Sequence, residues 1–197
     1  MRRLIVFNNL TLDGVMQAPG HPDEDRRGGF EHGGWAIPYQ DEVIGQVAAE
    51  GMAAGGPLLF GRWTYESMHS SWAGRTDNPF SEVLANSQKY VATRTLTEPA
   101  AWENTILLNG EAAGTVSAIK AEEGQDILTM GSGRLLDTLV RHDLVDRYML
   151  LIHPLVLGSG ATLFPEPHRM DLELVDAKPT TTGVIIATYD RADRSER

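Results

Sequence analysis

Short apolar segments alternate with segments of helical spacing along almost the whole chain, and this alternation limits the possible folds most strongly. Eight segments have the length and apolar content of buried strands: 4–7, 57–60, 89–93, 105–108, 126–130, 147–153, 172–177 and 184–189. Between them, helices are expected at 40–53, 64–71, 79–86, 115–122 and 135–142. Strands that alternate with helices predict a largely parallel sheet covered on both faces.

The last two predicted strands are separated only by residues 178–183, so they are expected to form an antiparallel hairpin at the sheet edge. The predicted fold class is α/β, with a three-layer α/β/α arrangement, a mostly parallel central sheet and an antiparallel C-terminal hairpin. A chain of 197 residues suits one domain, which we expect to span residues 1–197. In such sheets, ligands bind outside the carboxyl ends of the strands.

The charge balance narrows the possible partners. The 17 Lys and Arg residues against 27 Asp and Glu residues give a formal net charge of −10. This charge disfavours nucleic acid and anionic membranes as partners, and an anionic ligand would need a local cluster of donors. The absence of Cys excludes disulfides and thiolate metal sites. No apolar run reaches the length of a signal peptide core or a membrane span, so we expect a soluble cytoplasmic protein.

The predicted strand 57–60 runs into Gly61, Arg62, Trp63 and Thr64. The glycine permits a close turn, and the helix that follows begins with free N–H groups that suit a phosphate. Arg62 and Thr64 would add a charge and a hydroxyl donor. The alternative is that Thr64 only caps the helix and Arg62 only pairs with a surface acid.

Two further strand ends have the same character. Thr93 and Arg94 follow the strand 89–93, and an Arg at such a position can bind the 2′-phosphate that separates NADP from NAD. The third turn consists of Gly131, Ser132, Gly133, Arg134 and Leu135. Each turn also has an ordinary reading, as a solvated arginine or as a tight turn. Together, in an acidic protein, they favour a phosphate-rich dinucleotide.

Five segments resemble the dihydrofolate reductase-like superfamily, in the same order along the chain: 10–15, 59–66, 131–133, 146–154 and 158–165. They are most similar to the C-terminal reductase domain of bifunctional riboflavin-biosynthesis proteins, and segment 28–35 resembles that of the stand-alone bacterial members. The resemblance implies NADPH as the hydride donor, a nitrogen heterocycle as the substrate, and a homodimer. The deaminase domain of the bifunctional proteins is absent from this sequence.

The resemblance also suggests a proton donor, because dihydrofolate reductases place an acid early in the helix after the first long loop. Segment 35–41 is similar to that region, which makes Asp41 the first candidate, with Asp13 as the rival. As alternatives, Asp41 would only complement the helix dipole, and Asp13 would only bond to the backbone of its own turn.

Candidates for the substrate site are Asn8, which follows the first predicted strand, and the aromatic residues Trp35 and Phe164. An amide can bind the edge of a heterocycle and an aromatic ring can stack on it, although packing is the more common role for such aromatic residues. The longest irregular region, 17–34, is typical of a functional or disordered loop. Its His and acidic residues fit no ligand spacing, so no metal is expected. We expect His153 to be buried and hydrogen-bonded.

The predicted function is that of an NADPH-dependent oxidoreductase acting on a pyrimidine- or pteridine-like heterocycle. Within it, reduction of 5-amino-6-(5-phosphoribosylamino)uracil ranks above reduction of dihydrofolate. The alternative class is a non-catalytic NADP-binding sensor. A ribose phosphate would need a further cation, for which the sequence offers Arg26, Arg27 and Arg75 without favouring one.

Overall fold

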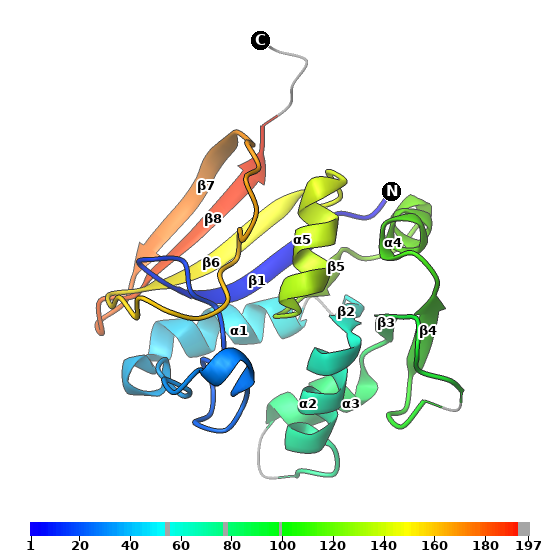
Figure 1. Cartoon of the computed structure of the whole chain (residues 1–197), viewed down its shortest axis with the longest axis horizontal. Coiled ribbons are helices and arrows are strands. Elements are labelled where there is room, and N and C mark those ends of the chain that lie inside the picture. Colours follow the sequence, from blue (N-terminus) through cyan, green and yellow to red (C-terminus); the bar gives the residue numbers. More distant parts are fainter. Residues whose placement is uncertain (54–55, 77–78, 99, 193–197) are drawn as a thin grey trace.

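The structure, a computed structural model, describes residues 1–53, 56–76, 79–98 and 100–192. One eight-stranded sheet crosses the molecule in the order β4-β3-β2-β5-β1-β6-β8-β7 (Figure 1). Its strands are β1 (Leu4–Thr11), β2 (Leu58–Gly61), β3 (Lys89–Thr93), β4 (Thr105–Asn109), β5 (Ile127–Thr129), β6 (Arg147–His153), β7 (Leu172–Pro179) and β8 (Ile185–Arg191). The helices are α1 (Glu42–Ala53), α2 (Arg62–Trp72), α3 (Pro79–Asn86), α4 (Ala112–Ala121) and α5 (Gly133–Arg141).

The strand directions confirm the predicted α/β class. From β4 to β6 every neighbouring pair is parallel, whereas β8 is antiparallel to both β6 and β7. The carboxyl ends of β2, β3, β5 and β1 therefore lie along one edge of the sheet. The turns singled out in the sequence all follow strands of this parallel part.

Alternation along the strands divides the core into two layers. Leu4, Val6 and Leu59 pack on one face with apolar residues of α4 and α5. Phe60 packs on the opposite face with α2 and α3, and Phe7 packs there with α1. Because successive side chains of a strand point to opposite faces, this division gives the three layers expected for the fold. Figure 1 shows α4 and α5 on one side of the sheet and α1, α2 and α3 on the other.

Several element boundaries differ from prediction, and two of these differences bear on the site. The first strand does not end at Phe7 but continues to Thr11, which places Asn8 inside the sheet rather than at a strand end. The strand accommodates this polar residue because its side-chain oxygen accepts a hydrogen bond from the N–H of Gly131. Helix α2 begins at Arg62, two residues before its predicted start, because the chain turns directly after Gly61.

The long region 17–34 is an ordered loop with a small core of its own. Val15, Ala18, Phe30, Trp35 and Ala36 are buried together, and residues 155 and 157 pack against them. Short 3₁₀ turns at Arg27–Gly29 and Ile37–Tyr39 shape this part of the chain. The loop is therefore held in place by packing against the segment that follows β6. No helix within the described residues has the length and apolar character needed to cross a membrane.

Candidate functional site

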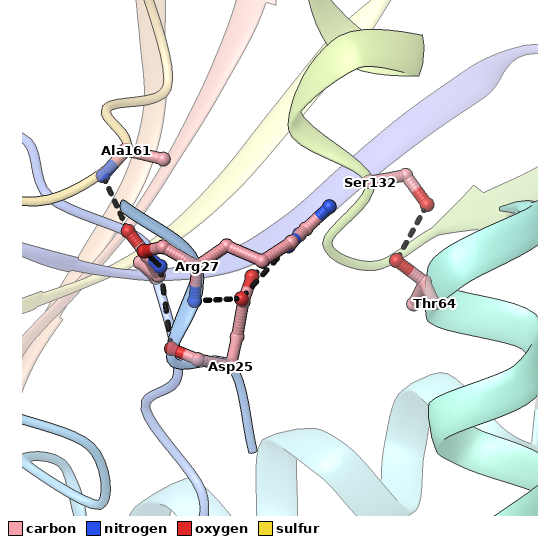
Figure 2. Close-up of polar contacts among 6 residues, drawn as sticks. Asp25, Arg27, Thr64, Ser132 and Ala161 are labelled. Atoms are coloured by element: carbon pink, nitrogen blue, oxygen red, sulfur yellow. Dashed lines mark hydrogen bonds and ion pairs between the residues drawn. The ribbon is translucent and has the colours of Figure 1, made fainter. Parts of the chain in front are cut away.

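The hydroxyl of Ser132 joins the turns that follow β2 and β5. It accepts a hydrogen bond from the backbone N–H of Gly61 at 2.8 Å. It also donates one to the hydroxyl of Thr64 at 2.8 Å (Figure 2). Ser132 has a φ of 66°, in the left-handed region that few non-glycine residues adopt. This conformation aims the hydroxyl of a residue before α5 at the first turn of α2, 71 residues away in the sequence.

Two glycines allow the close approach. A Cβ atom at Gly61 would lie 3.2 Å from the Ser132 Oγ, and one at Gly131 would lie 3.3 Å from the Thr64 Cγ2. Gly131 also has a φ of 66°, which a side chain would strain. Its N–H donates to the Oδ1 of Asn8 at 2.7 Å, and Asn8 is buried in β1. Neighbouring strands thus hold the turn from both sides.

Two helices begin at this junction without a side-chain cap. Gly61 occupies the cap position of α2 and Ser132 that of α5, and neither makes a capping hydrogen bond from its side chain. Thr64 is the third residue of α2, so it does not cap the helix as the simpler reading of the sequence suggested. The first N–H groups of both helices have no intrahelical acceptor, and each helix dipole is positive at this end. Both features favour an anion.

Arg62 links the first turn to the turn after β3. Its Nη1 donates to the Thr95 hydroxyl at 2.7 Å, while its Nε bonds to Glu66 at 2.8 Å. The hydroxyl of Thr93 accepts the N–H groups of Thr95 and Leu96 at 3.1 and 3.0 Å, which shapes that turn. All three sequence-predicted turns are therefore joined by hydrogen bonds.

The remaining turn residues lie at the rim or in the core. Arg94 pairs with Glu111 at 3.3 Å, and both side chains are largely exposed, at 76% and 85%. Arg134 is exposed at the start of α5. Leu135 is buried in the main core, so only its backbone N–H is suited to a ligand. Trp63 is half exposed on the first turn of α2.

The two candidate acids both hold loops together. Asp41 accepts the N–H of Val43 and the N–H and hydroxyl of Thr181, in the turn between β7 and β8. Asp13 accepts the Thr11 hydroxyl and the N–H groups of residues 157 and 158. The Thr181 hydroxyl lowers the pKa of Asp41, and the Thr11 hydroxyl together with backbone N–H groups lowers the pKa of Asp13. A lowered pKa keeps each carboxylate ionised at neutral pH, which disfavours it as a proton donor. The role of either acid in proton transfer stays a prediction.

The substrate candidates have separate environments. Trp35 is buried, its indole N–H donating to the Gln17 carbonyl at 2.7 Å and its ring lying edge-on to His153. Phe164 is 43% exposed and contacts Tyr148. His153 is buried and its Nε2 lies 2.9 Å from the Asn9 Oδ1, as its place in an apolar strand predicted. Contact of Trp35 and Phe164 with a substrate stays a prediction.

Sequence reasoning missed the role of Gln17, which is buried and whose side chain makes hydrogen bonds to three residues. Its amide nitrogen donates to the carbonyls of Asp25 and Arg27, and its amide oxygen accepts the N–H of Ala161. Through these bonds it sets the position of Arg27, whose guanidinium lies over the Trp63 ring. No signal in the sequence marks either contact, because both depend on how the loop packs.

The acidic loop forms ion pairs of its own. Arg26 pairs with Asp23, and Arg27 pairs with Asp25. Within the part of the chain that the structure describes, no group of three or more His, Asp or Glu side chains is arranged to hold a metal.

The fold and this junction define an α/β protein that presents two uncapped helix N-termini and a hydroxyl cluster at the carboxyl edge of a parallel sheet. The family model of the RibD C-terminal domain matches residues 2–186, and the chain belongs to this family. The uncharacterized protein YyaP of Bacillus subtilis is 29% identical over 198 residues, which cover 95% of this chain and 94% of that protein.

Two solved structures show the same fold. A putative riboflavin biosynthesis protein from Shewanella sp. PV-4 has a TM-score of 0.69 at 22% identity and covers 98% of this chain and 100% of its own. Dihydrofolate reductase from Enterococcus faecalis, complexed with NADP(H) and RAB-propyl, has a TM-score of 0.62 at 17% identity and covers 97% of each chain. The expected dihydrofolate reductase-like fold is thereby confirmed.

Proposed function

We propose that the protein is a reductase of the RibD and dihydrofolate reductase type that takes its hydride from NADPH. The observation that carries the proposal is the Ser132 junction, where two uncapped helix N-termini meet beside the hydroxyl of Thr64. In a protein of net charge −10, such a concentration of donors suits the pyrophosphate of a dinucleotide. The likeness to a dihydrofolate reductase that binds NADP(H) supports the same cofactor.

The residues of the junction fit this cofactor. The N–H groups of Gly61 and Gly131 are bonded to Ser132 and Asn8, so the N–H groups offered to the cofactor are those of the first turns of α2 and α5. Arg94 stands at the rim of the next turn, and we assign it to the 2′-phosphate. The bound nicotinamide supplies the hydride, and the chain supplies orientation and a route for the proton.

For the substrate we propose a pyrimidine- or pteridine-like heterocycle. The family match favours a ribosylaminopyrimidine of the 5-amino-6-(5-phosphoribosylamino)uracil type, and the structural likeness to dihydrofolate reductase favours dihydrofolate as the alternative. Hydride transfer to a C=N or C=O group leaves a basic atom that must accept a proton. Asp41 and Asp13 remain the candidates for that step, and Asn8, Trp35 and Phe164 remain those for substrate contact.

Cofactor titration tests this proposal. Quenching of protein fluorescence is measured with NADPH and with NADH for the wild type, for Arg94→Ala and for Arg141→Ala, an arginine paired with Asp137 at the far end of α5. We expect tighter binding of NADPH, a preference that Arg94→Ala removes and Arg141→Ala keeps. Equal affinity for both cofactors in the wild type would contradict the 2′-phosphate assignment.

Substrate screening then follows oxidation of NADPH with candidate heterocycles. Stoichiometric oxidation with one of them supports the reductase. Tight NADPH binding without turnover on any substrate would instead favour the non-catalytic sensor.

We also propose that the protein is a homodimer, as members of the family led us to expect. The edge strand β7 supports this, because Leu174 and Val175 are 59% and 52% exposed on it although both are apolar. An exposed apolar edge strand commonly marks an interface. Sedimentation equilibrium is expected to give twice the chain mass of 21.6 kDa, and a single-chain mass at micromolar concentration would refute the dimer.

A further inference from the structure

Arg27 is the one residue of the long loop 17–34 whose side chain the structure shows stacked on helix α2. Its guanidinium carbon lies 4.4 Å from the centre of the Trp63 ring, on the first turn of that helix. The Arg27 side chain is 56% exposed and Trp63 is 48% exposed, so the pair lies at the surface of the junction. Such a contact contributes about 0.5–1 kcal/mol at exposed sites. The stack therefore positions Arg27 more than it stabilises the fold.

The orientation of the guanidinium leaves one end directed at the Ser132 junction. Its Nε and Nη2 bond to the carboxylate of Asp25 at 2.8 and 2.5 Å. Among the described residues, Nη1 makes no hydrogen bond. Figure 2 shows the tip of the Arg27 side chain directed toward the side of the junction where the hydroxyls of Ser132 and Thr64 lie. An arginine carries five N–H donors, so this end still has donors for an anion.

The backbone of the loop is held so that the side chain keeps this direction. Gln17 donates to the carbonyls of Asp25 and Arg27 at 3.2 and 3.0 Å, and its oxygen accepts the N–H of Ala161 at 2.9 Å. Asp25, whose side chain is only 12% exposed, anchors the guanidinium through two atoms. A side chain fixed in this way loses less conformational entropy when it binds a ligand.

We propose that Arg27 is a phosphate-binding residue, which reaches from the loop to the pyrophosphate of the dinucleotide held at the starts of α2 and α5. The inference rests on the proposed function. It adds a cation to the backbone N–H groups and hydroxyls of the cluster, where Arg62 is already bonded to Glu66 and Thr95. A guanidinium is well suited to phosphoryl oxygens. Binding of the cofactor and the contact of the loop with α2 would then involve the same side chain.

Three proteins test the assignment: the wild type, Arg27→Gln, and Arg26→Gln as the matched control. Arg26 is the neighbouring residue, carries the same charge and pairs with Asp23, and its side chain is 72% exposed. Dissociation constants are measured for NADPH, inorganic pyrophosphate and ribose 5-phosphate, each titrated directly against the protein. We expect Arg27→Gln to weaken NADPH and pyrophosphate about tenfold. Arg26→Gln should stay within about twofold of the wild type.

Failure of this inference is distinguishable from failure of the proposed function. If the wild type does not bind NADPH, the proposed function itself is wrong and the role of Arg27 falls with it. If the wild type binds NADPH and Arg27→Gln matches Arg26→Gln, only the assignment of Arg27 is overturned. If Arg27→Gln weakens ribose 5-phosphate alone, the phosphoryl group belongs to the substrate and the cofactor assignment is overturned. Arg27→Lys, which keeps the charge but loses the fork, should bind NADPH with intermediate affinity, and thermal unfolding of each variant checks that it is folded.

Discussion

Substitutions of Ser132 can separate the effect of its hydroxyl group from the effect of its left-handed backbone conformation. In Ser132→Ala the N–H of Gly61 and the hydroxyl of Thr64 each lose a partner at 2.8 Å. A hydrogen bond contributes about 0.5–1.5 kcal/mol net, so a half-buried pair should stabilise the fold by about 1–2 kcal/mol. For a chain of this size that corresponds to a fall in Tm of about 3–6 °C.

Ser132→Gly removes the same hydroxyl but also relieves the left-handed backbone at a φ of 66°. That conformation costs a non-glycine residue about 1–2 kcal/mol. Glycine offsets part of this stabilisation, about 0.4–1 kcal/mol, because it gives the unfolded chain greater conformational freedom. We therefore expect the free energy of unfolding of Ser132→Gly to exceed that of Ser132→Ala by about 0.5–1 kcal/mol, which urea titration measures.

NADPH affinity should depend on the presence of the Ser132 hydroxyl and not on the stability of the variant. Both variants lose the group that holds the two helix starts together, so both should bind NADPH more weakly than the wild type and to a similar extent. The assay pairs urea unfolding with fluorescence titration of each variant. Wild-type NADPH affinity in both variants would refute the organising role of the hydroxyl, and a less stable glycine variant would refute the argument from backbone strain.

Three further predictions concern single side chains. Asn8→Leu removes the acceptor for the N–H of Gly131 and should lower the free energy of unfolding by about 1–3 kcal/mol, whereas Asn8→Asp, which keeps an acceptor, should lose less in the same urea titration. Burial lowers the pKa of His153 from 6.5 to about 4, so the folded state binds fewer protons than the unfolded state between these values. Stability should therefore fall by about 3 kcal/mol as the pH drops from 6.5 to 4, and His153→Leu should flatten that dependence in urea titrations across the range. Asp41→Asn or Asp13→Asn should lower turnover with NADPH binding retained, and full turnover by both variants on a validated substrate would exclude both as proton donors.

The secondary structure was accessible from the sequence because it depends on local patterns. Each of the eight strands and five helices was predicted near its observed position, and α3 has the predicted bounds. The main errors lay at ends where a distant contact decides the outcome. Asn8 is an example, because a polar residue after an apolar run predicts a strand end. The hydrogen bond that its side chain accepts from Gly131 allows the strand to continue.

The site was accessible only in part. The glycines, hydroxyls and arginines at three strand ends could be identified, because the residues after parallel strands gather at one edge of the sheet. Which of them touch could not be predicted. Ser132 meets Gly61 and Thr64 because β5 lies beside β2, although α3, β3, β4 and α4 intervene in the sequence.

By itself, then, the sequence determined the alternating elements, the antiparallel hairpin at the C-terminal end and the residue types at the strand ends. These follow from side-chain periodicity and turn chemistry, which act over a few residues. The tertiary structure alone decided that loop 17–34 lies against α2, with Arg27 stacked on Trp63. That placement depends on buried contacts of Gln17 with Ala161 and of Trp35 with His153, and packing of this kind leaves no periodic trace in the sequence.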